Sequence, residues 1–378
     1  MKTILILGGG VGGVVTANEL RKKIGKENKI IVFDKEQKHV FAPSLLWLMT
    51  GLRKQEKISR ELNRLNRKGI EFVNGEIVKF DPKTKSVVVD GETFKGDYIV
   101  LSLGAELSDE PEFKGKGHNF YTLEGALTLQ NALKNFKGGN VIVLVSSLPF
   151  KCPAAPYEAA LLLAYHFRKI KIRDKVTMEL YSPEPGPMGV AGKELSAAVR
   201  QLVESKGITY FPEHQFQKVN GSTLEFSDGK KAGFDLLAYV PKHVCPKVIR
   251  ETGLVSESEW VKVDRATMET EYSGVYAIGD ITGILLAVGK PLPKAGVFAH
   301  YQAEVVANNI AVAVNGKGKL KTFKGNGECF IEIGEGKAGF ARGNFYAEPL
   351  PKVKMFNPGV HWHVGKVLFE KDFLRRWF

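Results

Sequence analysis

Short apolar segments alternate with segments of helical spacing along the first half of the chain. Residues 3–7 and 29–33 have the aliphatic composition of buried strands, and residues 14–23 between them have the spacing of a helix. The same order recurs at 141–145 and 157–165. Parallel strands that are covered by helices on both faces read as continuous apolar runs. The pattern therefore predicts an α/β protein with two βαβ units.

A glycine-rich loop follows the first of these strands. Gly8, Gly10 and Gly13 occupy the glycine positions of G-x-G-x-x-G, and Gly12 adds a fourth glycine. The three positions permit a tight turn, a close approach to a pyrophosphate, and close packing of helix on strand, respectively. Asp34 ends the second strand roughly 20 residues further on, where a carboxylate can accept from a ribose hydroxyl. This unit predicts an adenine dinucleotide site in a Rossmann-like domain.

The second unit has the order of a nucleotide-binding half but lacks its loop. In place of glycines the loop carries Pro149, Pro153 and Pro156. Proline has no N–H to offer a diphosphate, so NADH is not expected to bind there. Cys152 lies just ahead of the predicted helix with Lys151 beside it, and both features favour the thiolate. The alternative interpretation is a buried structural cysteine.

Three further features lie downstream. The apolar strand at 272–280 ends in Gly279-Asp280, and Pro293-Lys294-Ala-Gly296 leads into a helix that is expected from Val297 to about Val314. Cys329 follows shortly after that helix. Together with the two loops, these features span most of the chain.

These residues resemble the sulfide:quinone oxidoreductases and the flavoprotein subunit of flavocytochrome c sulfide dehydrogenase, which are flavoproteins with two dinucleotide-binding domains. The most specific element is Cys152-Pro-Ala-Ala-Pro-Tyr-Glu158. The resemblance implies a non-covalently bound FAD, because the segment 41–45, where some relatives attach the flavin, has no cysteine. The residues it implies for FAD are Gly8, Gly10, Gly12, Gly13, Asp34, Gly279, Asp280 and Lys294.

The resemblance also implies roles for reactive residues. Cys152 and Cys329 are expected to face each other across the flavin and to carry sulfur as a disulfide or polysulfide. Lys294 is expected to stabilise negative charge on the reduced flavin, while Glu158 is expected either to move a proton or to cap its helix. The candidates for an apolar quinone slot are Phe330, Ile331 and Phe356. Many bacterial members have a third cysteine, which the corresponding segment 118–124 lacks.

The landmarks divide the chain into three parts. Residues 1–105 and 265–320 are expected to form a discontinuous FAD-binding domain, because the glycine loop and Asp280 must meet at one flavin. Residues 106–264 form a second Rossmann-like domain without a functional NAD loop. Residues 321–378 form a C-terminal region for quinone and membrane association.

Composition changes this picture mainly through charge. The chain has 54 Lys and Arg against 41 Asp and Glu, a net charge of +13, which attracts nucleic acid or anionic lipid. No nucleic-acid-binding signature is present, so nucleic acid is not an expected partner. The three cysteines do not suggest a disulfide framework, Cys245 is taken as structural, and no metal site is expected.

The C-terminus favours a lipid surface as partner. A helix over 362–378 is expected to be amphipathic, with Lys366 on a polar edge and an apolar face that can lie in a membrane interface. The apolar face is assigned to Val364, Val367, Leu368, Phe373, Leu374, Trp377 and Phe378. The alternative is that the helix packs on the protein or forms a homo-oligomer contact. The first strand leaves no room for a signal peptide and no apolar run reaches about 18 residues, so a peripheral membrane protein on the cytoplasmic side is expected.

The predicted function is that of a sulfide:quinone oxidoreductase, which oxidises hydrogen sulfide and reduces membrane quinone. Three alternatives remain open: a flavocytochrome-type sulfide dehydrogenase flavoprotein, a type II NADH:quinone oxidoreductase, and a non-enzymatic flavin-binding protein. The proline-containing loop argues against the second alternative, and reduction of the flavin by sulfide would exclude the last.

Overall fold

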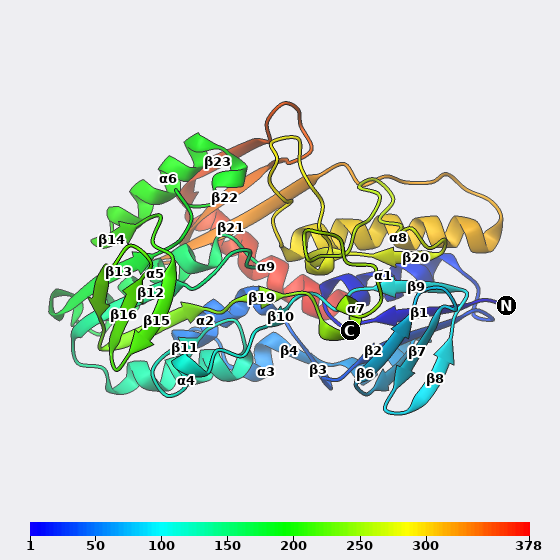
Figure 1. Cartoon of the computed structure of the whole chain (residues 1–378), viewed down its shortest axis with the longest axis horizontal. Coiled ribbons are helices and arrows are strands. Elements are labelled where there is room, and N and C mark those ends of the chain that lie inside the picture. The colour runs from blue at the N-terminus through cyan, green and yellow to red at the C-terminus, as the bar shows by residue number, and fades with distance from the viewer.

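Two five-stranded parallel sheets organise the chain, one in each half of an elongated molecule (Figure 1). This computed structural model describes residues 1–378. The first sheet has the order β20 (Val275–Ala277), β9 (Tyr98–Leu101), β1 (Thr3–Leu7), β2 (Lys29–Asp34), β5 (Glu71–Asn74). The second sheet has the order β11 (His118–Asn119), β18 (Leu236–Val240), β12 (Gly139–Val145), β13 (Val176–Tyr181), β14 (Ile208–Phe211).

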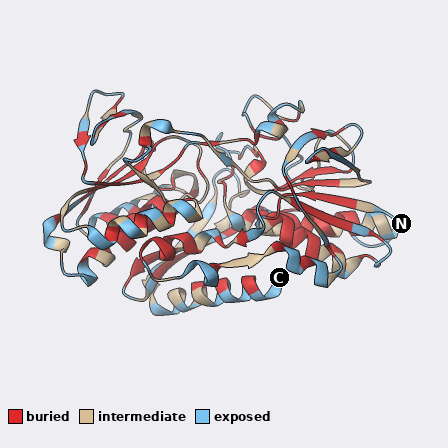
Figure 2. Cartoon of the chain, turned by 90° about the horizontal axis from the view of Figure 1, so that it is seen from below, coloured by how far each residue is buried: buried red, intermediate tan, exposed pale blue.

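Helices cover both sheets and bury their apolar faces (Figure 2). On the first sheet they are α1 (Val11–Lys23) and α8 (Gly296–Asn315), which pack on each other. Around the second sheet they are α4 (Leu123–Asn135), α5 (Ala155–Lys169) and α6 (Lys193–Glu204). The strands of both sheets have almost no exposed apolar residue, which agrees with the continuous apolar runs in the sequence.

Smaller elements fill the connections. The short helices are α2 (Leu45–Met49), α3 (Gln55–Ile58) and α7 (Lys247–Arg250). Two antiparallel pairs are β3 (Lys38–Val40) with β4 (Ser59–Glu61) and β10 (Glu106–Leu107) with β19 (His243–Val244). Two three-stranded antiparallel sheets have the orders β6 (Ile77–Asp81), β7 (Ser86–Val89), β8 (Glu92–Lys95) and β15 (Phe216–Asn220), β16 (Thr223–Phe226), β17 (Lys231–Gly233).

The C-terminal region is a three-stranded antiparallel sheet followed by a long helix. The elements are β21 (Asn326–Gly334), β22 (Lys337–Asn344), β23 (Lys352–Gly359) and α9 (Val360–Arg376). The half of the molecule built on the first sheet is called the first lobe, and the half built on the second sheet the second lobe. α9 runs from the second lobe towards the first and ends beside α1 (Figure 1). The sequence pattern predicted the helix but not the sheet.

The predicted fold class is confirmed. Both parallel sheets are Rossmann-like cores, and the first is assembled from distant segments, because Val275 of β20 pairs with Ile99 of β9. The domain bounds chosen from the sequence stay a prediction. None of the helices is both long enough and apolar enough to cross a membrane.

The prediction of the faces of α9 was wrong. Phe373, Leu374 and Trp377 do not widen an exposed apolar surface; they are buried against α1, α8 and the first sheet. Lys366 is also buried and lies on this inward face. The pattern was misleading because a lysine can lie in the interior when it pairs with a buried carboxylate. The exposed apolar residues of α9 are Val360, Val364, Leu368 and Phe369.

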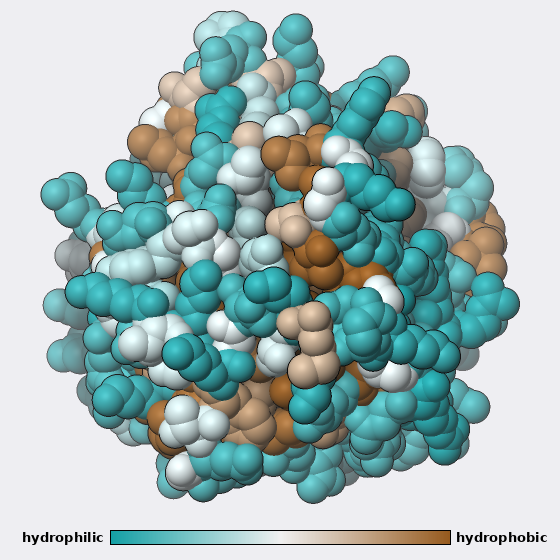
Figure 3. Space-filling view, turned by 90° about the vertical axis from the view of Figure 1, so that its right-hand side faces the viewer, coloured by the Kyte–Doolittle hydropathy of each residue, from teal (hydrophilic) through white to brown (hydrophobic).

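The surface carries the excess of positive charge. Hydrophilic side chains cover most of the end of the molecule that is formed by the first sheet, with apolar patches separated from one another (Figure 3). A cluster of basic residues lies on this lobe, formed by Lys2, Lys83, Lys85 and Lys95.

Candidate active site

The glycine loop between β1 and α1 is shaped by close contacts that exclude side chains. Gly8 has a φ of +109°, and a Cβ there would lie 2.5 Å from the carbonyl oxygen of Ser102. A Cβ on Gly13 would lie 1.8 Å from the carbonyl oxygen of Gly8. Gly10 differs, because the nearest protein atom to a Cβ there is 3.9 Å away. The fold thus requires Gly8 and Gly13, whereas Gly10 leaves an open space in front of the helix N-terminus.

Asp34, at the end of β2, fixes this loop from one side. Its Oδ2 accepts from the backbone N–H of Gly9 at 2.6 Å, and its Oδ1 accepts from the N–H of Glu36 at 2.8 Å. Burial raises the pKa of Asp34, and these two hydrogen bonds oppose the rise. The carboxylate therefore orders the loop, and its predicted contact with a ribose stays a prediction.

Asp280 lies in the turn that follows β20, the edge strand that pairs with β9. Its Oδ1 is buried and has no hydrogen-bond partner in the protein. Burial raises the pKa of Asp280, while the charges of Lys151 and Lys294 lower it. Gly279, with a φ of +74°, directs its N–H to Gln302 at 2.7 Å. The buried, unsatisfied carboxylate oxygen indicates that a hydroxyl or another donor belongs beside it.

Lys294 connects the two lobes. Its Nζ donates to the carbonyl oxygens of Asp280 at 2.6 Å and Thr282 at 3.2 Å, and lies 3.2 Å from the ring centroid of Trp260. Burial lowers the pKa of Lys294 to about 8, and the charge of Asp280 opposes this. Its carbonyl oxygen accepts from the N–H of Cys152 at 2.6 Å. The backbone around Lys294 thus ties the Asp280 loop to the cysteine loop.

Cys152 occupies the loop between β12 and α5. Its φ of 55° is in the left-handed region, which a residue with a side chain rarely adopts. The hydroxyl of Tyr121 lies 3.5 Å from its carbonyl oxygen. The loop therefore holds Cys152 in a strained conformation between the two lobes.

Cys329 reaches the same place from β21. Both sulfur-bearing side chains are partly buried and pack against the same hydrophobic cluster, which surrounds α5 and the second sheet. They lie close enough that a negative charge on Cys152 raises the pKa of Cys329, after the larger effect of burial. All three cysteines are free thiols, and Cys245 is buried in a separate cluster beneath the first sheet. The structure thus brings together the two cysteines expected to react and sets the third apart.

The prediction that the loop favours a thiolate was wrong for this structure. Burial, followed by the negative charge of Glu158, raises the pKa of Cys152 to about 12. The charge of Lys366 lowers it, but by less. A helix N-terminus and a neighbouring lysine are therefore outweighed by the loss of solvent around the sulfur.

Glu158 and Lys366 form a buried ion pair next to the cysteines. They come from α5 and α9, and each side chain is almost inaccessible to solvent. Burial raises the pKa of Glu158 to about 7, while the charge of Lys366 lowers it. A second pair lies beside them, where Nδ1 of His363 is 2.9 Å from a carboxylate oxygen of Glu332. Lys366 was not among the predicted site residues, because only tertiary structure turns it towards Glu158.

Comparison with known proteins shows the family to which the chain belongs. The family model described as pyridine nucleotide-disulphide oxidoreductase matches residues 2–303. The chain belongs to this family. It is 28% identical to the sulfide-quinone reductase of Aquifex aeolicus, over 99% of this chain and 90% of that protein. It is 23% identical to the mitochondrial sulfide:quinone oxidoreductase of Mus musculus, over 92% of this chain and 79% of that protein.

Comparison with solved structures shows a similarity to the same group of proteins. The X-ray structure of the sulfide:quinone oxidoreductase from the hyperthermophilic bacterium Aquifex aeolicus superposes with a TM-score of 0.89 at 26% identity, covering 100% of this chain and 91% of that one. The resemblance that was inferred from the cysteine motif is thereby confirmed. As a pyridine nucleotide-disulphide oxidoreductase, the chain is an FAD-dependent flavoprotein enzyme.

The residues present fit FAD. The space in front of Gly10 and the N-terminus of α1 suit a pyrophosphate, because the first N–H groups of a helix have no partner within it. The unpartnered Oδ1 of Asp280 suits a hydroxyl of the ribityl chain. Both lie beyond the carboxyl ends of parallel strands of one sheet, β1 and β20, which flank β9 on either side.

The three residues proposed for a quinone slot do not lie on one face. Alternation along β21 puts Ile331 in the buried cluster beside Cys329, with no exposed surface. Phe330 and Phe356 instead join an aromatic group at the start of α9, through Phe340, which is 4.9 Å from Phe330 and 6.0 Å from Phe356 between ring centroids. The structure therefore separates Ile331 from the other two.

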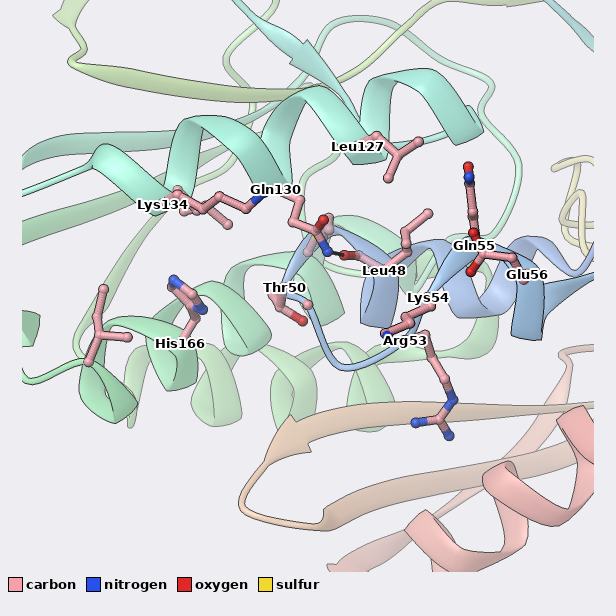
Figure 4. A pocket seen from close by; sticks show the side chains of 14 residues that line it. Leu48, Thr50, Arg53, Lys54, Gln55, Glu56, Leu127, Gln130, Lys134 and His166 are labelled. Carbon is pink, nitrogen blue, oxygen red and sulfur yellow. Dashed lines mark hydrogen bonds between the residues drawn. The ribbon is translucent and has the colours of Figure 1, made fainter.

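A cavity of about 630 Å³ lies elsewhere, between α2, α4 and α5 (Figure 4). Its wall includes Thr50, His166 and Gln130, whose side-chain amide donates to the carbonyl oxygen of Leu48 at 2.6 Å. None of the glycine-loop, cysteine or Lys294 side chains lines it. This cavity is therefore distinct from the candidate active site.

Proposed function

We propose that the chain is a sulfide:quinone oxidoreductase. It oxidises sulfide to sulfur or polysulfide through Cys152 and Cys329 and passes the electrons through FAD to a membrane quinone. The observation that carries this proposal is the meeting of two cysteines from distant segments in one buried place, held by the loop that replaces a nicotinamide phosphate loop. The names of the similar proteins support the same substrates.

The sulfur chemistry starts from the oxidised form, in which Cys152 and Cys329 are joined by a disulfide. A hydrosulfide ion attacks one sulfur, so that a new S–S bond forms a persulfide and the other cysteine leaves as a thiolate. A second hydrosulfide releases the outer sulfur as a polysulfide and leaves two thiols. The glycine loop and Asp280 would hold FAD, which would supply the two-electron acceptor needed to restore the disulfide and to reduce quinone.

Glu158 and Lys366 are suited to handle the protons of this exchange. A pKa of about 7 allows Glu158 to take up a proton from hydrogen sulfide and release it again near neutral pH. Lys366 keeps its charge, because Glu158 and Glu332 raise its pKa against the effect of burial. Its charge also stabilises a thiolate on Cys152 or Cys329. We assign Glu158 as the proton-transfer group, in preference to a helix cap.

Lys294 contributes electrostatically. Its ammonium group is buried at the junction of the two lobes, beside Asp280 and the cysteine loop. A positive charge held there stabilises negative charge that develops on a reduced cofactor. The proposed quinone contacts remain Phe330 and Phe356. Ile331 is buried in the cluster on which Cys329 packs, so it would support Cys329 and not contact the quinone directly.

An anaerobic experiment tests the proposal. Sulfide, and separately NADH, are added to the purified yellow protein, and the flavin absorbance is followed by stopped flow before a short-chain quinone is added. Sulfide is expected to bleach the flavin and quinone to restore it. Cys152→Ser and Cys329→Ser should each slow the bleaching on the order of a thousandfold, because the attacked disulfide cannot form. Bleaching by NADH instead would show that the type II NADH:quinone alternative is right.

We further propose that α9 attaches the enzyme to a membrane surface. Val360, Val364 and Leu368 are spaced along one exposed side of α9, and basic residues of its last turns flank them. Such a side can enter the headgroup region of an anionic bilayer. Leu368→Glu should weaken binding to anionic vesicles about tenfold, whereas Leu285→Glu, at an equally exposed leucine outside α9, should not. Equal loss in both variants would contradict the assignment.

A further inference from the structure

His39 is a buried histidine that no part of the proposed reaction uses. It lies on β3 with 4% of its surface exposed. Its Nδ1 is 3.0 Å from the carbonyl oxygen of Gly9 in the glycine loop. A carbonyl can only accept, so Nδ1 carries the proton and donates it. Its Nε2 has no partner in the protein.

This hydrogen bond completes the support of one residue of the loop, Gly9. The N–H of Gly9 donates to Asp34, and its carbonyl oxygen accepts from His39. With both polar groups of Gly9 occupied, the loop cannot turn at that residue without losing a hydrogen bond. The N–H groups that follow, at the start of α1, are then held in the direction of the phosphate site.

The end of α9 covers His39. The rings of Phe373 and Phe378 lie 5.5 Å and 5.0 Å from its ring centroid, one roughly stacked and the other tilted. Enclosure by these rings keeps water from the imidazole, and burial accordingly lowers the pKa of His39 to about 4, so that it is neutral near pH 7. A neutral imidazole with a fixed tautomer is a steady donor to Gly9.

α1 and the end of the segment Leu62–Lys68 in turn hold the end of α9. The side-chain amide of Asn18 donates to the carbonyl oxygen of Trp377 at 3.1 Å, and Nζ of Lys68 donates to that of Arg376 at 2.9 Å. Lys22 lies over the ring of Trp377 at 5.0 Å. These contacts satisfy carbonyl groups that the last turn of a helix leaves free. The helix whose N-terminus faces the phosphates therefore also anchors the last turn of α9.

We propose that His39 is a positioning residue for the FAD phosphate loop, and that the last turn of α9 holds it in place. FAD binding and the docking of the last turn of α9 then favour each other, since coupling between two sites is reciprocal. This links the proposed membrane helix to the retention of FAD. The inference concerns FAD binding alone, so it stands or falls independently of sulfide and quinone.

Two substitutions separate the two properties of the His39 side chain, its ring and its hydrogen-bond donor. His39→Phe keeps a ring between Phe373 and Phe378 but removes the donor to Gly9, while His39→Asn keeps an amide donor near the position of Nδ1. After removal of FAD, the apoproteins are titrated with FAD and binding is followed by quenching of flavin fluorescence. His39→Phe should raise the FAD dissociation constant about tenfold, which corresponds to ~1.4 kcal/mol. His39→Asn should recover most of this loss.

A truncation and a control complete the test. Removal of Phe378 should weaken FAD binding about threefold by exposing the imidazole to water. His118→Phe, at a histidine of the second lobe that contacts Thr128, should bind FAD as the native chain does. If His39→Phe does not fold, the removal of Phe378 carries the test, because its ring contacts the imidazole. Unchanged FAD affinity in His39→Phe, or in the truncation, would overturn the proposal.

Hydrogen exchange distinguishes positioning from a general structural role. In the native chain, FAD should slow amide exchange in the last turn of α9, although no part of the cofactor is proposed to touch it. In His39→Phe this response should be lost while exchange in α5 stays unchanged. An α9 whose exchange does not respond to FAD in the native chain would show that the two sites are not coupled.

Discussion

The two βαβ units of this chain place different chemistry at the same position. In the first, β1 leads through glycines into α1; in the second, β12 leads through prolines and Cys152 into α5. The glycine loop leaves an open space at Gly10. In the cysteine loop the N–H of Cys152 is already bonded to Lys294. One loop offers its backbone to an anion, and the other offers a side chain.

The comparison shows how a common scaffold changes function. A strand that leads into a helix always creates a polar helix end at the edge of a sheet. Glycines keep that end accessible to phosphate, whereas prolines and a backbone hydrogen bond close it. The second loop then positions a sulfur atom near another one from β21. A substitution in one loop should therefore leave the chemistry of the other loop unchanged.

The largest effect is expected in the glycine loop. Gly10→Ala should weaken FAD binding about a hundredfold, ~2.7 kcal/mol, because its Cβ enters the space proposed for the pyrophosphate. The melting temperature of the apoprotein should stay unchanged, since the nearest protein atom is 3.9 Å away. Gly13→Ala is the contrasting variant and should lower that temperature, because its Cβ meets Gly8 at 1.8 Å. Equal apoprotein stability of the two variants would contradict this division.

An intermediate effect is expected in the cysteine loop. Glu158→Gln removes a negative charge that raises the pKa of Cys152, so alkylation of the reduced protein by iodoacetamide should become about tenfold faster at pH 8. Peptide mass spectrometry measures the modification of Cys152 separately from that of Cys329. FAD affinity should not change. Slower alkylation would show that Glu158 does not act on the sulfur through its charge.

Lys366→Met should act in the opposite direction. Its positive charge lowers the pKa of Cys152, so its removal should slow alkylation several-fold. Arg375→Met, on the exposed side of α9, is the matched control, because its side chain is 85% exposed. Equal alkylation rates in Lys366→Met and Arg375→Met would show that the charge of Lys366 does not act on Cys152.

The same thiol can be tested without a substitution, through the shape of the pH profile in the native chain. A thiol whose pKa is raised to about 12 gains thiolate as the pH rises and reaches no plateau below that value. Alkylation of Cys152 should therefore increase close to tenfold for each pH unit between 8 and 10. A plateau near pH 8 would show that the loop does favour the thiolate, as the sequence suggested.

Much of the fold was predictable because its signals are local. The apolar run of β1, the spacing of α1 and the glycines between them lie within about 20 residues, and each has a direct physical reason. The same holds for α8, whose bounds differ from the prediction by a residue at each end. The strands β21–β23 were missed because apolar and polar residues alternate only weakly along them, so the sequence gives little indication of how they pair.

The candidate site was predictable in its residue types but not in its environment. The motif around Cys152 identified the sulfur, but the pKa of that sulfur depends on burial and on Glu158. Lys366 was placed on a polar edge, since lysine is rarely buried unless it is paired. Its partner lies on α5, and no periodicity within α9 reveals it.

The two α/β units, the phosphate loop and the loss of a second one can be read from the amino-acid sequence, because they depend on neighbouring residues and on the absence of an N–H in proline. Three contacts are visible only in the folded chain: Cys329 approaches Cys152, Lys366 pairs with Glu158, and the end of α9 covers His39. These contacts join segments far apart in the chain. Their energies come from desolvation and charge at sites that exist only after folding.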